Sequence, residues 1–481
     1  MKPRPTFVSI FFSSLLETRS QSPLLDLVML HLTRPLRSLS GRRLLYTTAS
    51  RQCPIPKSFK SQIPNRLDAQ PDPNVSRQTP LGELLSKVIK VTGPLTVSMY
   101  MRQCLTHPEH GYYTSRDPLG ARGDFITSPE ISQMFGEMIG VWFFALWLVQ
   151  GKPASVNFVE FGPGKGTLMF DAMRSFGRLL NKREDPAKVK LNIVFVEASH
   201  VLRQRQAALL GDSDVDATGE FWKAKHRWGG DLLWVDTEKD VFEITHESDT
   251  NFIIAHEFFD ALPINKFVKV DDGTWREIHV DQHPDTGELC LVRTPHETPM
   301  CSIVKTNPRY STVPAGTVVE VSPDTAMYTA TISQLITRNE KSTGGALIVD
   351  YGPKMGVPSN TLRGIKDHKI VNPFHDPGEV DLSADVDFQA VAQAAIDAAD
   401  VSVVGPVDQG DFLEQVGMGT RLKQLEKHVK TENEREILMT GYKRLVEKNG
   451  ASMGKIYKFM GIVPKGVEVP IGFDPLTKND Y

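Results

Sequence analysis

The 481-residue sequence predicts an α/β protein with a mostly parallel β-sheet. Residues 156–161 are a mostly apolar run rich in Val and Phe, and a glycine-rich turn and a helical pattern over residues 167–180 follow it. A second apolar run at residues 191–196 completes a strand–helix–strand unit. Further apolar runs at residues 251–255 and 345–350 also lead into acidic residues. Because parallel strands end at one edge of the sheet, we expect a ligand site there.

The glycine-rich turn fits one cofactor motif better than two others. A P-loop needs Ser or Thr after its lysine, but Lys165 is followed by Gly166. A dinucleotide fingerprint needs glycine where Thr167 stands, which weakens that interpretation. What remains is the first motif of class I S-adenosylmethionine methyltransferases, an acidic residue followed by three alternate glycines: Glu160, Gly162, Gly164 and Gly166. An ordinary glycine-rich turn is the alternative.

Two acidic residues support S-adenosyl-L-methionine as the expected cofactor. The carboxylate of Glu160 would favour the positive charges of the donor, and the glycines would admit its methionine part. Glu197 closes the second strand on the ligand side and is placed to accept hydrogen bonds from both ribose hydroxyls. A surface carboxylate is the alternative for Glu197.

The loop at residues 120–132 is a second candidate for contact with the cofactor or substrate. Thr127 and Glu130 have capping-box spacing, which predicts a helix from this point through residue 147. Capping does not explain the polar and aromatic residues just before it. We therefore expect cofactor contacts from Gly123, Asp124, Phe125, Thr127 and Ser128.

The segment after the strand at residues 251–255 is the predicted active site. It holds two acids and two aromatics: Glu257, Phe258, Phe259 and Asp260. A capped helix start is the alternative. Residues 376–388 are also rich in acids, which could hold a cationic substrate or face the dipole of the next helix, for which Ser383 is the expected N-cap.

Composition excludes several classes of protein. With 40% hydrophobic and 23% charged residues, the chain is typical of soluble globular proteins. Its four cysteines contain no CxxC pair, which argues against a disulfide framework or a zinc site, so no metal is expected. Residues 52–481 carry nine more acidic than basic side chains, so general affinity for nucleic acid is not expected, and a basic protein substrate fits better.

Residues 1–51 have the composition of a mitochondrial transit peptide. They hold eight basic and two acidic residues among many Leu and Ser. A secretory signal is disfavoured by the arginines after the apolar run, and that run is too short to span a bilayer. The acid-free stretch from Met29 would make a good presequence alone, so translation could start there.

The rest of the chain divides by pattern. Residues 52–80 are a proline-rich linker, residues 81–150 an N-terminal helical region, and residues 151–465 the catalytic domain. Alternating residues and an Asp-Asp-Gly turn predict an antiparallel insertion at about residues 264–313. Residues 466–481 form a C-terminal tail.

The chain resembles the mitochondrial MidA family, the complex I assembly factor methyltransferases. The resemblance is carried by residues 123–132, 160–167, 257–263, 349–352, 376–388 and 409–413. It implies a Rossmann-like seven-stranded class I methyltransferase fold in the mitochondrial matrix. It also implies symmetric dimethylation of an arginine on a peripheral-arm subunit of NADH:ubiquinone oxidoreductase (complex I).

In that reaction we expect Glu257 and Asp260 to clamp the guanidinium of the substrate. The family usually has Asn where this chain has His256, and the role of His256 stays open. A catalytically silent assembly scaffold remains an alternative. A nucleic-acid methyltransferase is disfavoured because the Asn/Asp-Pro-Pro-Tyr motif is absent after the fourth strand. We expect no stable membrane insertion, and the oligomeric state is not predicted.

Overall fold

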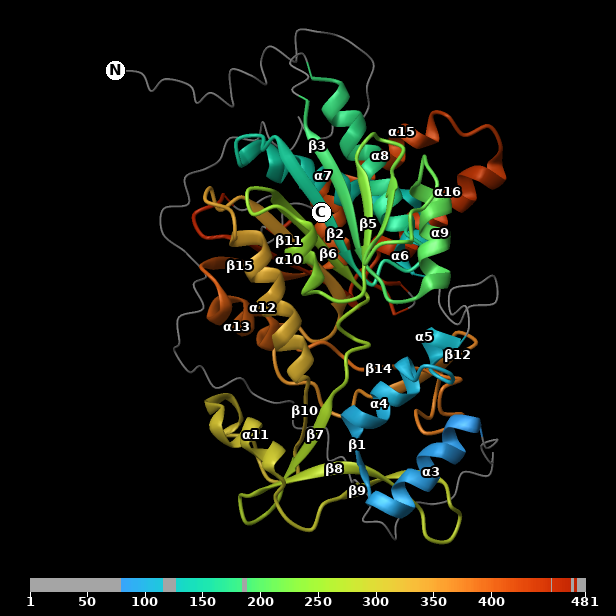
Figure 1. Cartoon of the computed structure of the whole chain (residues 1–481), viewed down its shortest axis with the longest axis vertical. Coiled ribbons are helices and arrows are strands. Elements are labelled where there is room, and N and C mark those ends of the chain that lie inside the picture. The colour runs from blue at the N-terminus through green and yellow to red at the C-terminus, as the bar shows by residue number, and fades with distance from the viewer. Residues whose placement is uncertain (1–78, 116–126, 184–187, 451, 469–470, 474–481) are drawn as a thin grey trace.

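A computed structural model of the chain describes residues 79–115, 127–183, 188–450, 452–468 and 471–473. The predicted transit peptide, nearly all of the predicted linker, and Gly123, Asp124 and Phe125 lie outside the described residues. Figure 1 shows a larger unit around one broad sheet and a smaller unit below it.

The larger sheet has eight strands, not the seven predicted. Its spatial order is β15 (Val401–Asp408), β16 (Tyr457–Pro464), β11 (Gly344–Tyr351), β6 (Thr250–His256), β2 (Ser155–Phe161), β3 (Lys190–Val196), β5 (Asp231–Val235) and β4 (Trp222–Lys225). Strands β11, β6, β2, β3 and β5 are parallel, whereas β16 runs antiparallel to both neighbours. The additional strand, β4, pairs antiparallel with β5 at the edge. It has a weak sequence signal because only Ala224 of its four residues is buried.

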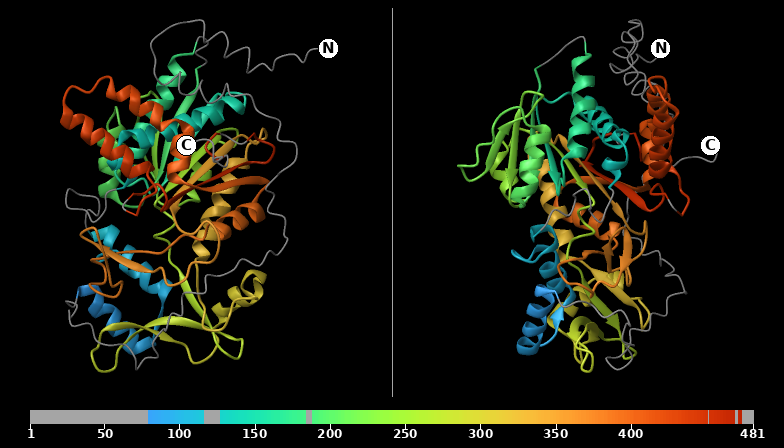
Figure 2. Two further views of the ribbon diagram at one scale, coloured as in Figure 1. Left: turned by 180° about the vertical axis from the view of Figure 1, so that it is seen from behind. Right: turned by 90° about the vertical axis from the view of Figure 1, so that its right-hand side faces the viewer.

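Two hydrophobic clusters cover the faces of this sheet. Figure 2 shows helices on both of these faces. Residues such as Phe158 of β2 face one cluster and the next residue, Val159, faces the other. The first face is covered by α7 (Gln133–Val149), α8 (Thr167–Asn181), α9 (His200–Leu210), α14 (Gln409–Val416), α15 (Met418–Glu426) and α16 (Glu432–Val446). The second is covered by α10 (Asp240–Ile244), α12 (Pro323–Thr337) and α13 (Phe388–Ala398).

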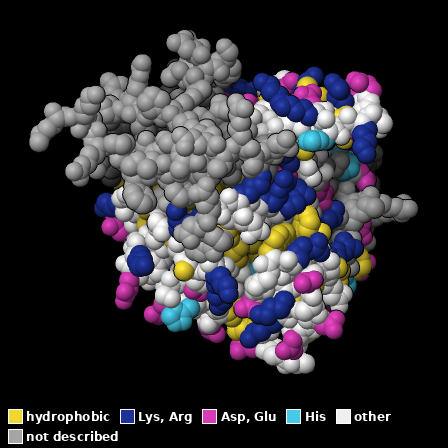
Figure 3. Space-filling view, turned by 90° about the horizontal axis from the view of Figure 1, so that it is seen from above, with side chains coloured by type: hydrophobic (Ala, Val, Ile, Leu, Met, Phe, Trp, Pro, Cys, Tyr) yellow, Lys and Arg dark blue, Asp and Glu magenta, His cyan; other side chains and the backbone are white. Residues whose placement is uncertain are grey.

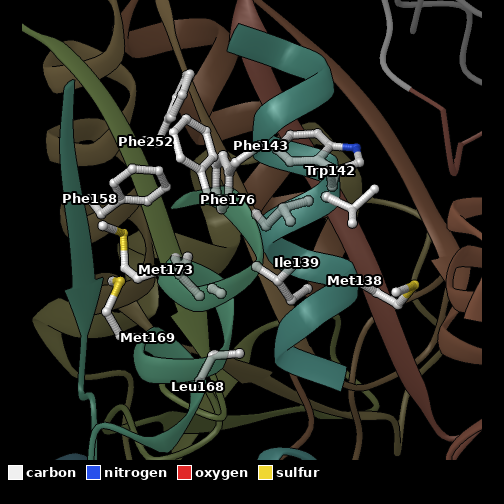
Figure 4. Close-up of a cluster of buried hydrophobic side chains, with 14 of the residues drawn as sticks. Met138, Ile139, Trp142, Phe143, Phe158, Leu168, Met169, Met173, Phe176 and Phe252 are labelled. Atoms are coloured by element: carbon white, nitrogen blue, oxygen red, sulfur yellow. The ribbon is translucent and has the colours of Figure 1, made fainter. Parts of the chain in front are cut away.

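Helix α7 lies at the centre of the first cluster (Figure 4). It packs closely against α8 because Gly140 has no side chain: an added Cβ would lie 2.0 Å from Ser175 Oγ and 2.2 Å from the Ala172 carbonyl oxygen. Phe143 of α7 stacks on Phe252 of β6 with ring centroids 5.1 Å apart. The apolar run in α7 is therefore a buried helix, and none of the described helices is long and apolar enough to cross a membrane.

The smaller unit is built on the predicted antiparallel insertion. Its sheet has the order β1 (Leu95–Thr96), β8 (Trp275–Gln282), β7 (Asn265–Lys269) and β10 (Val318–Val321), with β9 (Leu289–Arg293) also paired to β8. The predicted hairpin is confirmed, with Lys266 opposite Ile278. Around it lie α3 (Pro80–Thr92), α4 (Val97–Thr106), α5 (Tyr112–Ser115), η1 (Pro299–Cys301), α11 (Ser302–Thr306) and η2 (Pro308–Tyr310). The region predicted as one helical block, residues 81–150, is thus divided, since α3 and α4 pack here and α7 packs on the larger sheet.

Two helix predictions need correction: a helix does begin after Thr127, but it does not continue through residue 147, and the N-cap predicted for α13 is wrong. The helix expected from Thr127 through residue 147 is broken at Ser132 into α6 (Ser128–Ile131) and α7, and Thr127 makes no side-chain capping bond. Ser132 has extended backbone angles and accepts a hydrogen bond from the Met134 N–H, so it caps α7 itself. Helix α13 is capped by Asp387, whose carboxylate accepts from the Ala390 N–H, and not by Ser383.

The segment containing Ser383 forms a small sheet of its own. Strand β12 (Arg363–Lys366) lies between β13 (Lys369–Val371) and β14 (Asp381–Ser383), and all three are antiparallel. These short strands carry few apolar residues, so they have no clear periodicity in sequence. They bring the acidic segment to the space between the two units (Figure 1).

Candidate functional site

The glycine-rich turn leaves the carboxyl end of β2 in a conformation that suits glycine. Gly162, Gly164 and Gly166 all have positive φ, at 62°, 53° and 82°. An added Cβ on Gly162 would lie 3.0 Å from the Phe258 ring, and one on Gly166 would lie 2.9 Å from Leu210. Helix α8 begins directly after the turn and directs its unpaired N–H groups toward it. The turn is therefore a backbone cradle in which a side chain at 162 or 166 would clash.

Glu160 lies just before this cradle with an unsatisfied carboxylate. It is buried on β2, and its Oε2 atom has no hydrogen-bond partner among the described residues. Burial raises the pKa of Glu160 well above its usual range. A buried polar atom without a partner is costly, so this oxygen fits a ligand that brings a donor or a positive charge.

Glu197 is held at the next strand end by a residue that the sequence did not single out. Its Oε1 accepts from the Ser199 N–H at 2.8 Å, and its Oε2 lies 3.4 Å from Gln206 Nε2. Gln206 also donates to the Gly164 carbonyl oxygen at 2.7 Å and accepts from Trp234 Nε1 at 2.8 Å. Gln206 thus connects the glycine cradle to Glu197. Burial raises the pKa of Glu197 to about 7.

The other residues predicted to contact the cofactor are placed only in part. Ser128 is buried, and its hydroxyl lies 3.9 Å from Met453 Sδ, so it faces the C-terminal segment. Thr127 is half-buried. Lys165, which weakened the P-loop interpretation, pairs with Glu130 at 2.5 Å and ties the cradle to α6. Contact of Thr127 and Ser128 with a cofactor stays a prediction.

The predicted active-site segment follows β6 in a strained conformation. Glu257 has a φ of 50°, which is unfavourable for a residue with a side chain. Its N–H donates to the Val349 carbonyl oxygen at 2.9 Å, which anchors the turn to β11. Its Oε1 has no hydrogen-bond partner among the described residues and lies 3.4 Å from His256 Nε2. This strained turn directs a buried carboxylate toward the strand-end edge that also carries the glycine cradle.

The pKa values of Glu257 and His256 are both shifted in the direction that favours the neutral side chain. Burial, and then the charge of Asp260, raises the pKa of Glu257 to about 8, while the Ser128 backbone and the Tyr457 hydroxyl oppose the rise. Burial lowers the pKa of His256 to about 3. Perturbed groups of this kind are concentrated at functional sites.

Asp260 is the second predicted catalytic acid, and it is firmly positioned. It is buried and hydrogen-bonded to the Tyr351 hydroxyl. Burial raises its pKa, while Tyr351 and the charge of Arg363 lower it. Asp350, at the end of β11, accepts from the Phe259 N–H at 3.0 Å and the Asp260 N–H at 3.2 Å. The carboxylate of Asp350 therefore shapes the turn that carries both predicted catalytic acids.

The acidic segment at residues 376–388 contributes only some of its acids to this region. Asp381 accepts from the Tyr113 hydroxyl at 3.0 and 2.9 Å, and the pKa of Tyr113 is raised by burial and by the charges of Asp381 and Asp260. Asp376 instead pairs with Lys366 at 2.9 Å. Other acids of the segment serve other bonds: Asp385 pairs with Arg363 and Asp387 with Arg309.

The arrangement defines a class of protein. A parallel sheet carries a glycine cradle, an acid at the end of each of the first two strands, and a cluster of three acids at the ends of β6 and β11. These are Glu257 and Asp260 after β6 and Asp350 in β11; Asp260 and Asp350 are buried, and so is the Oε1 atom of Glu257. The unpaired oxygen of Glu160 and the cradle fit the sulfonium cofactor that the motif predicted. The fold and the site are those of an S-adenosylmethionine-dependent methyltransferase.

Comparisons with known proteins identify the family. The family described as "Putative S-adenosyl-L-methionine-dependent methyltransferase" matches residues 138–407. The protein called "Protein arginine methyltransferase NDUFAF7, mitochondrial" is 38% identical in Xenopus tropicalis over 428 residues, covering 88% of this chain and 93% of that protein. In Homo sapiens it is 36% identical over 399 residues, covering 82% and 85%. The chain belongs to this methyltransferase family and uses S-adenosyl-L-methionine.

A solved structure supports the fold. A Burkholderia thailandensis protein bound to S-adenosyl-homocysteine superposes with a TM-score of 0.62 at 21% identity, covering 82% of this chain and 93% of its own. The named relatives confirm the family resemblance that the sequence showed, because they are mitochondrial protein arginine methyltransferases.

Proposed function

We propose that this protein is a protein arginine N-methyltransferase. The main support is the acidic cluster at the ends of β6 and β11, in which one buried oxygen of Glu257 has no hydrogen-bond partner among the residues that the structure describes. A guanidinium is a planar cation whose N–H groups match carboxylate oxygens, so it would supply both the charge and the donors that this cluster lacks. The names of the curated relatives support arginine as the acceptor.

The residues of the site have separate tasks in this proposal. S-adenosyl-L-methionine supplies an electrophilic methyl group. Glu160, Glu197 and the cradle bind the donor, and Asp260, with Tyr351 on one oxygen, orients the guanidinium. Glu257 accepts the proton that the attacking nitrogen loses, which is needed because a guanidinium with a pKa above 12 is a poor nucleophile. The hydrogen bonds of Asp350 keep the two acids in place, so that most of the catalytic effect comes from positioning.

The pKa shift of Glu257 is compatible with this task. Without ligands, burial and the charge of Asp260 hold Glu257 largely neutral near pH 7. An arriving guanidinium places a positive charge beside it, which favours ionisation. Glu257 would then act as a base only when the arginine acceptor is bound. When no arginine is bound, a neutral Glu257 avoids a buried charge without a partner.

The finer parts of the proposal rest on the family resemblance. We propose that the acceptor is an arginine on a peripheral-arm subunit of complex I, that the product is symmetric dimethylarginine, and that the reaction takes place in the mitochondrial matrix. The basic, acid-poor N-terminal segment supports import into mitochondria. The charge balance of residues 52–481 is that expected for a protein acting on a basic segment.

Figure 3 shows that the upper face carries both basic and acidic side chains with hydrophobic ones between them.

The test is peptide mass spectrometry of complex I subunits from cells with and without this protein. We expect one arginine-containing peptide to lose the mass increment of two methyl groups when the protein is removed. Fragment ions that release monomethylamine would indicate symmetric dimethylation, and dimethylamine would indicate the asymmetric product. Wild-type protein should restore the increment and the Glu257→Gln variant should not. Equal methylation in both cell lines would reject the complex I substrate.

A further inference from the structure

His256 is a buried titratable group beside the predicted base that the mechanism above does not use. Its side chain is 7% exposed and that of Glu257 is 13% exposed. His256 Nε2 and Glu257 Oε1 are 3.4 Å apart, and neither has a hydrogen-bond partner among the described residues. Leaving one buried polar atom unsatisfied is costly, and two such atoms side by side call for an explanation.

A single proton between these atoms would satisfy both. A neutral imidazole has one ring nitrogen that accepts a hydrogen bond, and a protonated carboxyl group has one O–H that donates. Two neutral partners with no proton between them repel, because each presents a lone pair. The pair is complementary when one proton lies between these two atoms, either on Glu257 with His256 Nε2 as the acceptor or on Nε2 with the ionised Glu257 as the acceptor.

The surroundings favour the state in which Glu257 carries the proton over the states in which Glu257 is ionised. The charged and titratable groups that act on Glu257 are Glu130 from α6, Asp260 from the same turn, Asp350 from β11 and Tyr457 from β16. On its other side His256 packs against the Phe135 ring, with ring centroids 5.2 Å apart. Three of the four groups are acids, which favour a protonated Glu257, and the apolar ring disfavours a charged imidazole.

We propose that His256 is a positioning residue that accepts a hydrogen bond from Glu257 after Glu257 has taken the proton of the substrate. In this step a nitrogen–carbon bond forms, the carbon–sulfur bond of the donor breaks, and the proton of the attacking nitrogen passes to Glu257. The sulfonium becomes a neutral thioether, and the methylated guanidinium keeps its positive charge. His256 thereby stabilises the state in which the base is protonated and raises the basicity of Glu257.

The inference rests on the proposed function but has a structural basis of its own. The alternative is that His256 has only a packing role against Phe135. The two cases differ in what a shape-retaining substitution does. His256→Leu removes the acceptor and keeps an apolar side chain, whereas His256→Gln places an amide group near the position of Nε2.

The kinetic test compares these two variants with wild type in arginine methylation as a function of pH. In His256→Leu we expect the plateau of kcat to fall about tenfold, since a hydrogen bond to the protonated base is lost. The rising limb of the profile should move to lower pH, because a bond to the neutral form raises a carboxyl pKa. The dissociation constant for S-adenosyl-L-methionine should stay within about twofold of wild type. His256→Gln should recover most of the plateau and of the midpoint.

Several outcomes would overturn the proposal. An unmoved midpoint in His256→Leu, a plateau within twofold of wild type, or a His256→Gln variant as impaired as His256→Leu would show that His256 only fills space. If both variants unfold, infrared spectroscopy of the wild-type protein still tests the contact. The carboxyl band that is present in wild type and missing in Glu257→Gln belongs to Glu257. A band at the frequency of a carboxyl without a hydrogen bond would exclude the contact.

The infrared measurement also separates the two proposals. It needs neither cofactor nor substrate, so it reports on the contact alone. A hydrogen-bonded carboxyl band that moves to higher frequency in His256→Leu would support the contact even if no arginine methylation were found. That combination would reject arginine as the acceptor and retain the His256–Glu257 pair.

Discussion

The same strands carry two sets of buried polar groups with opposite properties. In the interior, Asn157 of β2 donates to Asn251 Oδ1 at 3.0 Å and lies 3.2 Å from Asp249 Oδ2. Asn192 of β3 donates to Asn157 Oδ1 at 2.8 Å, and Asn251 donates to the Leu335 carbonyl oxygen at 2.9 Å. These asparagines form a ladder across three adjacent strands, and they lie opposite one another in register. The ladder needs no ligand.

At the carboxyl edge, only a few residues further along, the pattern is reversed. Glu160 Oε2, His256 Nε2 and Glu257 Oε1 are all buried, and none of them has a hydrogen-bond partner in the part of the chain that the structure describes. Burial of polar groups is therefore not in itself a sign of function. A satisfied ladder holds strands in register, whereas unsatisfied atoms at a strand edge mark where a ligand is expected.

The largest expected effect is on catalysis at the unsatisfied edge. Glu257→Gln should lower turnover by about 10²–10⁴-fold, because an amide cannot take the proton of the attacking nitrogen. Radiolabelled methyl transfer measures it, with cofactor affinity determined separately. Asp376→Asn is the matched control, since that acid is paired with Lys366, and its turnover should stay within about threefold. Unchanged turnover in Glu257→Gln would remove Glu257 from the mechanism.

The next effect concerns the cradle. Gly164→Val should weaken S-adenosyl-L-methionine binding by more than about 100-fold, because φ at this position is 53° and a branched side chain would disturb the cradle. Gly273→Val is the control: Gly273 has a φ of 81° in the turn between β7 and β8, and an added Cβ meets no atom within 4 Å. Both variants bear backbone strain, and calorimetry measures how tightly each binds S-adenosyl-L-methionine. Loss of binding in both variants would show that backbone strain, and not the cradle, is responsible.

The interior ladder predicts a loss of stability. Asn157→Leu should lower the free energy of unfolding by about 2–4 kcal/mol, since it leaves Asn192 without its acceptor and Asn251 and Asp249 without their donor. Guanidinium denaturation would measure the change, and cofactor affinity of the folded fraction should be little altered. A stable variant that has lost its cofactor affinity would contradict the division between ladder and edge.

The smallest expected effect is a change in how stability depends on pH. The folded pKa of Glu160 is raised above its ordinary value of 4.5, so the native state binds more protons than the unfolded state above that pH. The stability of the unliganded protein therefore falls as pH rises from about 4.5 toward the folded pKa. Glu160→Gln should remove this slope, so that the unliganded variant loses less stability than wild type between pH 5 and pH 8, while it weakens cofactor binding. Denaturation curves at pH 5 and pH 8 that are the same for both proteins would exclude it.

Local patterns were sufficient for much of the fold. The strands at residues 156–161, 191–196 and 251–255 are apolar because both faces of the sheet are covered, and such runs are visible in sequence. The prediction of helix starts was weaker. Thr127, Ser132, Ser383 and Asp387 are all capable caps, and the choice among them depends on how the chain enters each helix.

The sequence by itself determined the class of this protein, because the glycines of the cradle and the acids at strand ends are local features with a fixed spacing. It also determined which turn would carry the predicted catalytic acids, Glu257 and Asp260. Only the tertiary structure decided their partners. Tyr351 and Tyr457 come from segments far along the chain from the two acids, and Gln206 lies 42 residues from Gly164. Nothing in a local pattern predicts that Gln206 joins Gly164 to Glu197 or that His256 Nε2 lies 3.4 Å from Glu257 Oε1. Burial follows from the whole fold, and burial is what raises or lowers the pKa of each group at this edge.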